Sequence, residues 1–223
     1  MQRVPEPEEL MDDGEQAAAY AEADFADANN RFVELLEAMA PRQLAGRLLD
    51  LGCGPADIPL RLAQRHSNLE IDALDGALAM LDLAQKALDR QAKVAGQIRL
   101  LHDRLPSNQL RAEGYQYVVS NSLLHHLDDP SVLWQTIAKC AMRGAWVLVM
   151  DLERPRSNTA VDALVESYAL DAPDVLRRDF RNSLYAAYTL EEVRRQVRRA
   201  GLSSLTVDRV SDRHLAVRGQ LPF

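Results

Sequence analysis

Two glycines directly after a short apolar run mark the most informative turn of the sequence. Residues 48–57 read Leu-Leu-Asp-Leu-Gly-Cys-Gly-Pro-Ala-Asp, so Gly52 and Gly54 flank Cys53 at the end of a strand predicted at 47–51. Glycine lets a ligand approach the backbone closely, and the helix predicted to start at Asp57 would point its first amides into the same space. Alone, the pattern also fits an ordinary tight strand–helix turn. The dinucleotide fingerprint would need a third glycine where Asp57 stands, and an acid near the helix start disfavours a pyrophosphate there.

Acidic and amide side chains stand at the ends of the following predicted strands. Asp75 follows the strand predicted at 69–74, Asp103 follows the one at 97–102, and Asn121 follows the one at 115–120. Parallel sheets bind ligands at the carboxyl ends of their strands. A carboxylate at Asp75 can accept from both hydroxyls of a ribose, and one at Asp103 can accept from an adenine amino group. Each acid alone could be an exposed loop residue, but together with Asp50 they predict a site for a nucleoside-like ligand.

Two adjacent histidines, His125 and His126, lie just past the fourth predicted strand. Imidazole titrates near neutral pH and suits a general base, so both are candidate catalytic residues, with His125 preferred. Adjacent side chains are expected to point apart, so only one should face a substrate. The alternative is that they pack or hydrogen-bond at a helix start. Cys53 and Cys140 form neither a disulfide framework nor a CxxC zinc pair, and no metal site is predicted.

A regular alternation of strands and helices positions these residues. Helices are predicted at 15–39, 57–66, 78–90, from 129–130 onward and at 189–201, and further strands at 145–150, 205–210 and 214–218. The buried positions expected in the first helix are Tyr20, Phe25, Phe32, Leu35 and Leu36. Thr189 and Glu192 have the spacing of a capping box. The alternation predicts a three-layer α/β/α sandwich with a mostly parallel seven-stranded sheet that ends in an antiparallel hairpin.

Taken together, these motifs resemble the class I S-adenosylmethionine-dependent methyltransferases. The resemblance covers residues 45–151 and, in outline, 189–218. It rests on the segments 49–55, 74–76 with Met80-Leu81, 102–103, 118–130 and 144–151. It implies a Rossmann-like fold, S-adenosyl-L-methionine as methyl donor and S-adenosyl-L-homocysteine as product. The family often has a third glycine where Ala56 stands, but alanine is small enough to leave the implication intact.

The resemblance also implies roles for individual residues. Asp50, Gly52 and Gly54 would surround the methionine part of the donor, with Cys53 inside the same turn, and Asn121 would lie near its amino group. Asp75 would hold the ribose hydroxyls, beside Gly76 and Met80. Asp103 would contact the adenine together with Arg104 or Leu105. Tyr20 matches an N-terminal tyrosine that closes over the donor in small-molecule members of the family.

The segment at 152–188 departs most from the common pattern, and we expect it to select the acceptor. It follows the fifth strand on the side of the donor and mixes aromatic and cationic groups that suit an aromatic or carboxylate-bearing molecule. The candidate acceptor-binding residues are Arg154, Tyr168, Arg181 and Tyr185. An ordinary helical cover is the alternative. We therefore divide the chain into an N-terminal helical cover (1–44) and a methyltransferase domain (45–223) that carries this insert.

Composition narrows the function classes. With 223 residues, 33 acidic against 26 basic side chains and a net charge of −7, the chain predicts a globular protein that does not bind duplex nucleic acid in general. A basic stripe at Arg194, Arg195, Arg198 and Arg199 leaves an RNA patch open, although a solvated helix face is the simpler interpretation. Neither a spanning helix nor a signal-peptide core is present, which predicts a cytoplasmic protein without a membrane partner.

The preferred function is methyl transfer to a small molecule, by a monomer or homodimer. The alternatives are an enzyme that modifies tRNA or protein and a non-catalytic partner that only binds the donor. Asn121-Ser122-Leu123-Leu124 stands where enzymes that methylate base or amide nitrogens carry an Asn-Pro-Pro-Tyr-like motif, which disfavours that chemistry.

Overall fold

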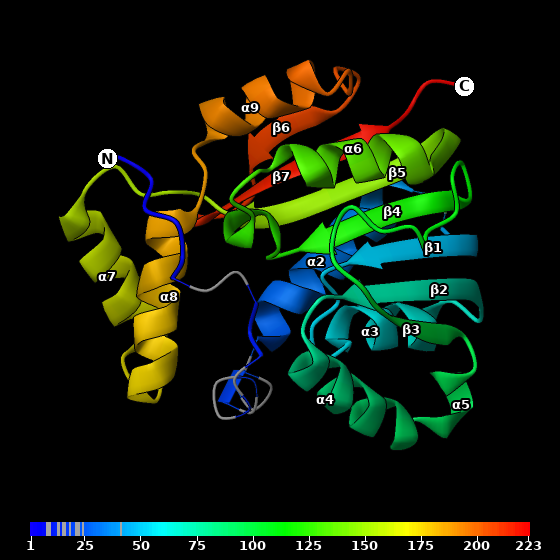
Figure 1. Cartoon of the computed structure of the whole chain (residues 1–223), viewed down its shortest axis with the longest axis horizontal. Helices are drawn as coiled ribbons and strands as arrows, with labels where there is room; N and C mark the ends of the chain where they lie inside the picture. The colour runs from blue at the N-terminus through cyan, green and yellow to red at the C-terminus, as the bar shows by residue number, and fades with distance from the viewer. Residues whose placement is uncertain are drawn as a thin grey trace.

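The computed structural model describes residues 1–7, 10–12, 14, 17, 19–20, 23, 25–40 and 42–223. Its centre is a seven-stranded sheet with the order β3-β2-β1-β4-β5-β7-β6 (Figure 1). The strands are β1 Ala45–Leu51, β2 Asn68–Asp75, β3 Ile98–His102, β4 Tyr115–Asn121, β5 Ala141–Leu152, β6 Thr206–Arg209 and β7 His214–Gln220. Strands β1 to β5 run parallel, and β7 is antiparallel to β5 and to β6. The predicted fold, a mostly parallel sheet closed by an antiparallel hairpin, is confirmed.

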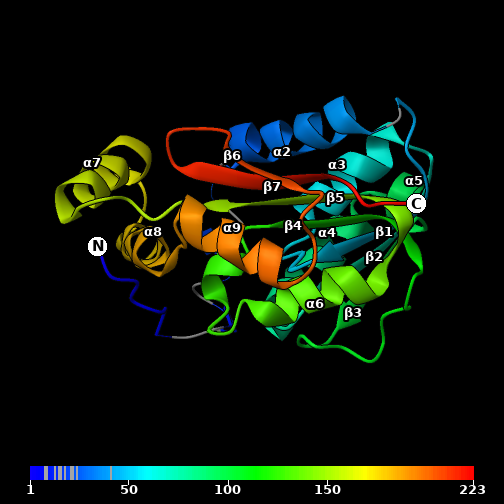
Figure 2. The same ribbon diagram turned by 90° about the horizontal axis from the view of Figure 1, so that it is seen from above.

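Helices cover both faces of the sheet and give the three predicted layers (Figure 2). They are α2 Ala26–Met39, α3 Asp57–Arg65, α4 Leu78–Asp89, α5 Ala92–Ala95, the 3-10 turn η1 Leu124–His126, α6 Ser131–Cys140, α7 Asn158–Ala169, α8 Asp174–Ala186 and α9 Leu190–Arg199. Helices α2, α3 and α4 pack on one face, and α6 and α9 pack on the other. The predicted capping box of Thr189 and Glu192 starts α9. Among the described residues, no helix has the length and apolar character needed to cross a membrane.

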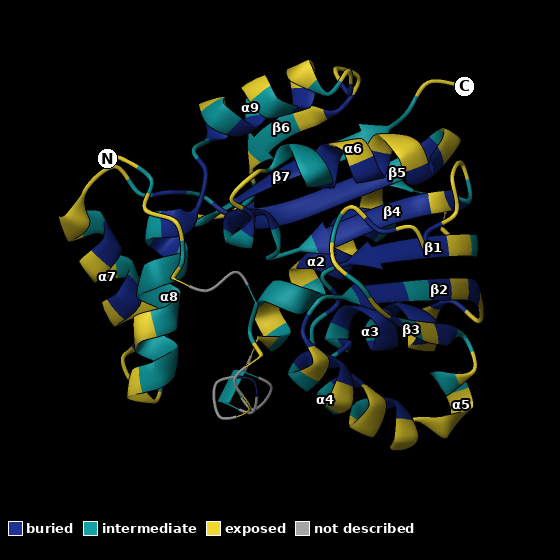
Figure 3. Ribbon diagram, viewed as in Figure 1, coloured by how far each residue is buried: buried dark blue, intermediate teal, exposed yellow. Residues whose placement is uncertain are grey.

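Side chains of the central strands alternate between the two faces. On β5, Val147 and Val149 belong to the core under α6 and α9, whereas Leu148 and Met150 belong to the core under α2 and α3. Successive residues of a strand point to opposite sides, and a strand covered on both sides is apolar throughout. The central strands are accordingly buried along most of their length (Figure 3). This packing fixes the carboxyl ends of the strands, where the predicted site residues stand.

The predicted N-terminal helix is interrupted. The sequence pattern favours one helix over 15–39, and Ala17, Ala19 and Tyr20 are indeed helical, but Ala23 and Phe25 are not, and α2 begins at Ala26. Phe32 is buried in the core as expected, whereas Phe25 is 36% exposed. The rings of Phe25 and Tyr20 instead stack on one another, with centroids 4.7 Å apart. The apolar pattern of the sequence continues across this interruption because Tyr20 and Phe25 line a cavity, and neither packs against the sheet.

The segment 152–188 folds into the helices α7 and α8, which pack against each other beside the sheet (Figure 1). Val161, Val165 and Leu184 form the centre of a small apolar cluster between them. The cluster is extended by Leu152 at the end of β5. This segment therefore has a core of its own, and that core decides which of its side chains turn inward.

Residues 1–7, which we call the N-terminal strap, lie along α8 (Figure 1). The backbone amide of Val4 donates to the carbonyl oxygen of Tyr185 at 3.1 Å. Arg3 donates to the carbonyl oxygens of Ala186, His125 and Leu127 at 2.5, 3.0 and 3.1 Å. Its guanidinium also lies 4.3 Å from the centre of the Tyr188 ring. The strap thus ties α8 to η1 at the carboxyl edge of the sheet.

Candidate functional site

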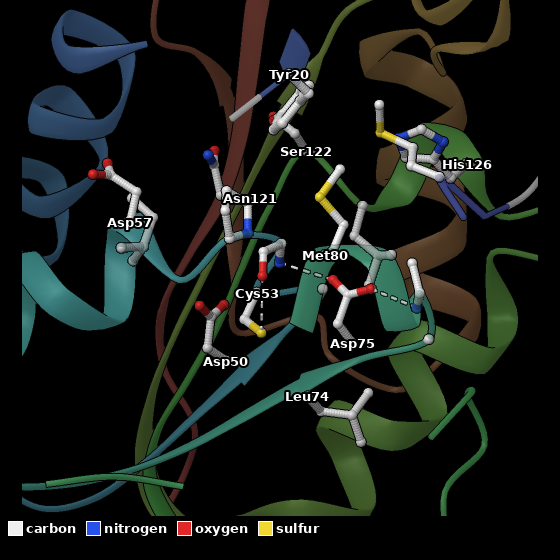
Figure 4. A pocket seen from close by; sticks show the side chains of 18 of the residues that line it. Tyr20, Asp50, Cys53, Asp57, Leu74, Asp75, Met80, Asn121, Ser122 and His126 are labelled. Carbon is white, nitrogen blue, oxygen red and sulfur yellow. Dashed lines mark hydrogen bonds between the residues drawn. The ribbon is translucent and has the colours of Figure 1, made fainter. Parts of the chain in front are cut away.

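A cavity of about 290 Å³ opens at the carboxyl ends of β1, β2 and β4 (Figure 4). All eleven residues predicted to bind the cofactor lie in its wall, namely Tyr20, Asp50, Gly52, Cys53, Gly54, Asp75, Gly76, Met80, Asp103, Arg104 and Asn121. Most of them stand at or just after separate strand ends that the parallel sheet brings to one edge, whereas Met80 lies on α4 and Tyr20 precedes α2. The predicted convergence of these positions is therefore observed.

The Gly-rich turn is shaped by four residues with positive φ. Gly52, Gly54 and Ala56 have φ of 75°, 52° and 67°, and Ser122 opposite them has 58°. The left-handed region strains a residue that carries a Cβ, and such strain is typical of functional sites. A Cβ added to Gly52 would lie 3.0 Å from Leu123, whereas one added to Gly54 would meet no atom within 4 Å. The turn thus packs tightly at Gly52 and leaves open space above Gly54, facing the cavity.

Asp75 organises the floor of the cavity. Its Oδ2 accepts a hydrogen bond from the amide of Gly54 at 2.8 Å, and its Oδ1 accepts one from the amide of Ala77 at 2.9 Å (Figure 4). Burial raises the pKa of this carboxyl in spite of the two amides. Asp75 therefore joins the end of β2 to the glycine turn after β1.

Asp103 stands in a different environment, at the exposed rim. It accepts from the hydroxyl of Ser107 at 2.6 Å and from the amide of Arg104 at 2.9 Å. The hydrogen bond from Ser107 lowers its pKa. Asp103 is therefore an ionised acceptor at neutral pH.

Asp50 and Asn121 line the opposite end of the cavity. Asp50 is 2% exposed, and burial, helped by the negative charge of Asp75, raises its pKa to about 8. Asn121 donates through Nδ2 to Oδ1 of Asn29 at 3.4 Å, while its own Oδ1 is buried and has no hydrogen-bond partner among the described residues. A buried amide oxygen without a donor is costly. This end of the cavity is therefore suited to a ligand that brings a cationic N–H donor.

Several residues at the cavity were not predicted from the sequence. Oδ2 of Asp57 accepts from Asn29 and from Arg61, both at 2.6 Å, which ties α2 to the start of α3. The signal available in the sequence was the i,i+4 spacing of Asp57 and Arg61. Leu10 and Met11 also line the cavity from the N-terminal side.

The two histidines differ in their relation to the cavity. His126 lies in the cavity wall and His125 does not. His125 is buried, and its Nδ1 lies 2.6 Å from Oδ1 of Asp151. The preference for His125 over His126 at the substrate face is therefore wrong, because Asp151 at the end of β5 holds that ring inside. The expectation that the two rings point apart is also wrong, since their centroids lie 4.2 Å apart.

The four predicted acceptor-binding residues do not reach the cavity. Arg154 is buried and donates to the carbonyl oxygen of Ala187 at 3.0 Å and to Glu192 at 2.9 Å. Arg181 forms an ion pair with Asp162 between α8 and α7.

Tyr168 and Tyr185 also make other contacts. Tyr168 is 48% exposed and donates to Asp212 at 2.5 Å. Tyr185 packs against the α7–α8 cluster. The prediction placed these four side chains by segment, whereas contacts with other parts of the fold keep them out of the cavity.

Comparison with known proteins covers most of the chain. Residues 20–207 match a family profile described as "Methyltransferase domain". An uncharacterised methyltransferase of Mycobacterium tuberculosis is 26% identical over 176 residues, which are 77% of this chain and 85% of that protein. The trans-aconitate 2-methyltransferase of Rhodococcus jostii is 31% identical over 161 residues, 68% of this chain and 57% of that protein. The crystal structure of a SAM dependent methyltransferase from Aquifex aeolicus superposes with a TM-score of 0.68 at 14% identity, over 94% of this chain and 98% of that one.

Proposed function

The chain belongs to the class I S-adenosylmethionine-dependent methyltransferases, and from this premise we propose that it methylates a small molecule bound beneath its N-terminal segment. The observation that carries the proposal is the roof of the cavity. Met11, Tyr20 and Phe25 line it from the N-terminal side, and Leu123 and Leu127 line it from the loop after β4. A macromolecular acceptor would have to displace this roof, whereas a small molecule with an apolar part fits beneath it.

Two independent observations indicate that the walls of the cavity fit the donor. The open space above Gly54 is a cradle that any side chain would fill. Oδ1 of Asn121, which has no partner among the described residues and lines the same cavity as the buried carboxyl of Asp50, matches the amino group of the methionine part. We assign Asp75 to the ribose hydroxyls and Asp103 to the adenine amino group. These assignments rest on hydrogen-bond chemistry, because each carboxylate is an acceptor for the hydroxyl or amino donors of the ligand.

The chain's own contribution to the reaction is positioning. When bound, S-adenosylmethionine supplies a methyl group on a sulfonium sulfur, which keeps the electron pair of the broken bond when the lone pair of the acceptor attacks. Such a displacement needs the attacking atom, the methyl carbon and the sulfur in line, and a held geometry supplies most of the rate. Gly54, Asp75 and Asn121 hold the donor at three points. Tyr20 and Phe25 close the space above it and exclude water.

The test is a search for the methylated product. Purified protein is incubated with a donor that carries a deuterated methyl group, together with a metabolite extract, bulk tRNA or cell protein in separate reactions. We expect a mass gain of one deuterated methyl group in a molecule of the metabolite reaction. With the donor below its dissociation constant, the label should fall at least about tenfold with Asp75→Ala and stay unchanged with Asp208→Ala, a surface carboxylate paired with Arg218 on the hairpin. Label found only in tRNA or protein would overturn the proposed acceptor class and leave the donor site standing.

A further inference from the structure

One carboxylate and two imidazoles converge beside the cavity, where the strap meets η1. Oε2 of Glu6 lies 2.8 Å from Nδ1 of His126, and Oε1 of Glu6 lies 3.8 Å from Nε2 of His125. The potential ligand atoms of the three residues all lie within 4.8 Å of one another. Imidazole nitrogen and carboxylate oxygen are the ligands that zinc and related ions take in catalytic sites.

The ring of His125 is oriented as a metal ligand is. Its Nδ1 lies 2.6 Å from Oδ1 of Asp151, and Asp151 is itself held by the amides of Leu124 and Leu152, both at 2.7 Å. A carboxylate on Nδ1–H fixes the tautomer that leaves a lone pair on Nε2, as in carboxylate–histidine–metal arrangements. Nε2, the nitrogen that remains available for a ligand, lies 3.8 Å from Oε1 of Glu6. A divalent cation between them would be bound by both groups.

The second imidazole has an unused nitrogen at the same place. Nδ1 of His126 is buried and has no assigned hydrogen-bond partner among the described residues, although Oε2 of Glu6 lies 2.8 Å away. Glu6 is fixed from behind by the hydroxyl of Ser183, which donates to its Oε1 at 2.6 Å. The two separations from Glu6 to the histidines, 2.8 and 3.8 Å, bracket the value of about 3.4 Å expected between two ligands of a tetrahedral zinc ion.

The surrounding charges favour a cation at this point. Glu6 and Asp151 contribute two carboxylates, and the carboxylate of Asp75 interacts with His126 from the cavity floor. The opposing charge is that of Arg3, whose guanidinium donates to the carbonyl oxygens of His125 and Leu127.

We propose that Glu6, His125 and His126 bind one divalent transition-metal ion of the zinc class, with Asp151 orienting His125. This gives the histidines a role as ligands in place of the predicted role as free bases. The metal site goes beyond the methyl transfer proposed above. It rests on that proposal in one respect only. Because His126 lines the cavity, the ion would stand next to the bound acceptor and lower the pKa of its hydroxyl or thiol.

The experiment titrates the full-length protein, stripped with a chelator, with Co²⁺ alone. Visible absorption reports nitrogen and oxygen ligands, and Zn²⁺ is then added as a competitor. We expect one ion per chain and loss of the Co²⁺ bands when Zn²⁺ displaces it. Glu6→Gln and His126→Gln should each weaken binding at least about tenfold. Glu37→Gln is the matched control, because it alters a second His–Glu pair, in which Nε2 of His66 lies 3.0 Å from Glu37.

Two results would overturn the proposal. One is the absence of Co²⁺ absorption and of binding heat up to millimolar metal in protein that is folded by circular dichroism. The other is unchanged metal affinity in Glu6→Gln. Glu6 lies on the strap rather than in the core, so this variant keeps the test valid if His126→Gln does not fold. Donor binding, measured by calorimetry on the same samples, separates failure of the metal site from failure of the donor site.

Discussion

Binding of the donor should release a proton from Asp50. The carboxyl of Asp50 is 2% exposed and has a pKa of about 8, so below neutral pH it is protonated in the free protein. The amino group of the donor is a cation in the same range, and its pairing with Asp50 requires the ionised carboxylate. Each donor bound at pH 5.5 to 7 must therefore displace close to one proton into solution.

The size of the pH dependence of donor affinity follows from the raised pKa of Asp50. In the range below 7, the ionised fraction of Asp50 rises about tenfold per pH unit, and the apparent affinity rises with it. Between pH 5.5 and 7 this amounts to about 30-fold, or roughly 2 kcal/mol of binding free energy. The slope disappears once the pH exceeds the pKa of the carboxyl.

Isothermal titration calorimetry in buffers of different ionisation enthalpy measures both the number of protons released and the affinity for the donor. The demethylated product, S-adenosyl-L-homocysteine, is a suitable second ligand because it carries the same amino group and no sulfonium charge. In Asp50→Asn we expect the proton release to vanish and the affinity to become flat over this range. The reasoning is refuted if the wild-type protein binds either ligand without releasing a proton, or if Asp50→Asn keeps the full slope.

The same shift has a consequence for folding. The pKa of Asp50 is raised in the folded protein, so between about pH 4 and 8 the native state holds a proton that the unfolded chain has released. Stability from this group is therefore present at low pH and lost as the pH rises toward 8. Urea unfolding of ligand-free protein should show a decline from pH 6 to 8 that is reduced in Asp50→Asn.

Three further perturbations test other parts of the site. Asp75→Ala should weaken donor binding at least about tenfold, roughly 1.4 kcal/mol, by calorimetry, and an unchanged affinity would mean that the ribose lies elsewhere. Ala56→Gly should raise the free energy of unfolding in urea by roughly 0.5 kcal/mol, because it relieves the φ of 67° at some cost in unfolded-state entropy; a lower stability would show that this residue is not strained. Arg3→Ala should lower stability by about 1–3 kcal/mol and speed hydrogen exchange at η1, since it removes three hydrogen bonds and the contact with Tyr188, whereas Arg177→Ala, an exposed pair with Asp174, should change neither.

The convergence of the predicted cofactor-binding residues on one cavity could be predicted from the sequence for a simple geometric reason. Parallel strands end at a common edge, so acids that follow successive strands converge whatever the intervening helices do. Asp50, Asp75 and Asp103 needed only the strand boundaries, which strong apolar runs define well. The turn after β1 could be predicted because glycine, present at Gly52 and Gly54, is the residue type that tolerates positive φ.

The acceptor end could not be read in the same way. Whether Arg154 or Tyr168 faces the donor depends on how α7 and α8 pack against one another, and periodicity does not contain that information. His125 and His126 are neighbours whose directions are decided by Asp151, which is 26 residues away, and by Glu6 on the strap. Both partners become neighbours of η1 only through the tertiary fold.

The position of the strap also sets an order of events during synthesis. Arg3 and Glu6 are made well before their partners Ala186 and Ser183, which are 183 and 177 residues further along the chain. Until α8 has emerged from the ribosome, the strap lacks the carbonyl oxygens of Tyr185 and Ala186 and the hydroxyl of Ser183 on which it docks. A nascent chain that already has its glycine turn therefore still lacks the contacts that hold Glu6 beside His125 and His126.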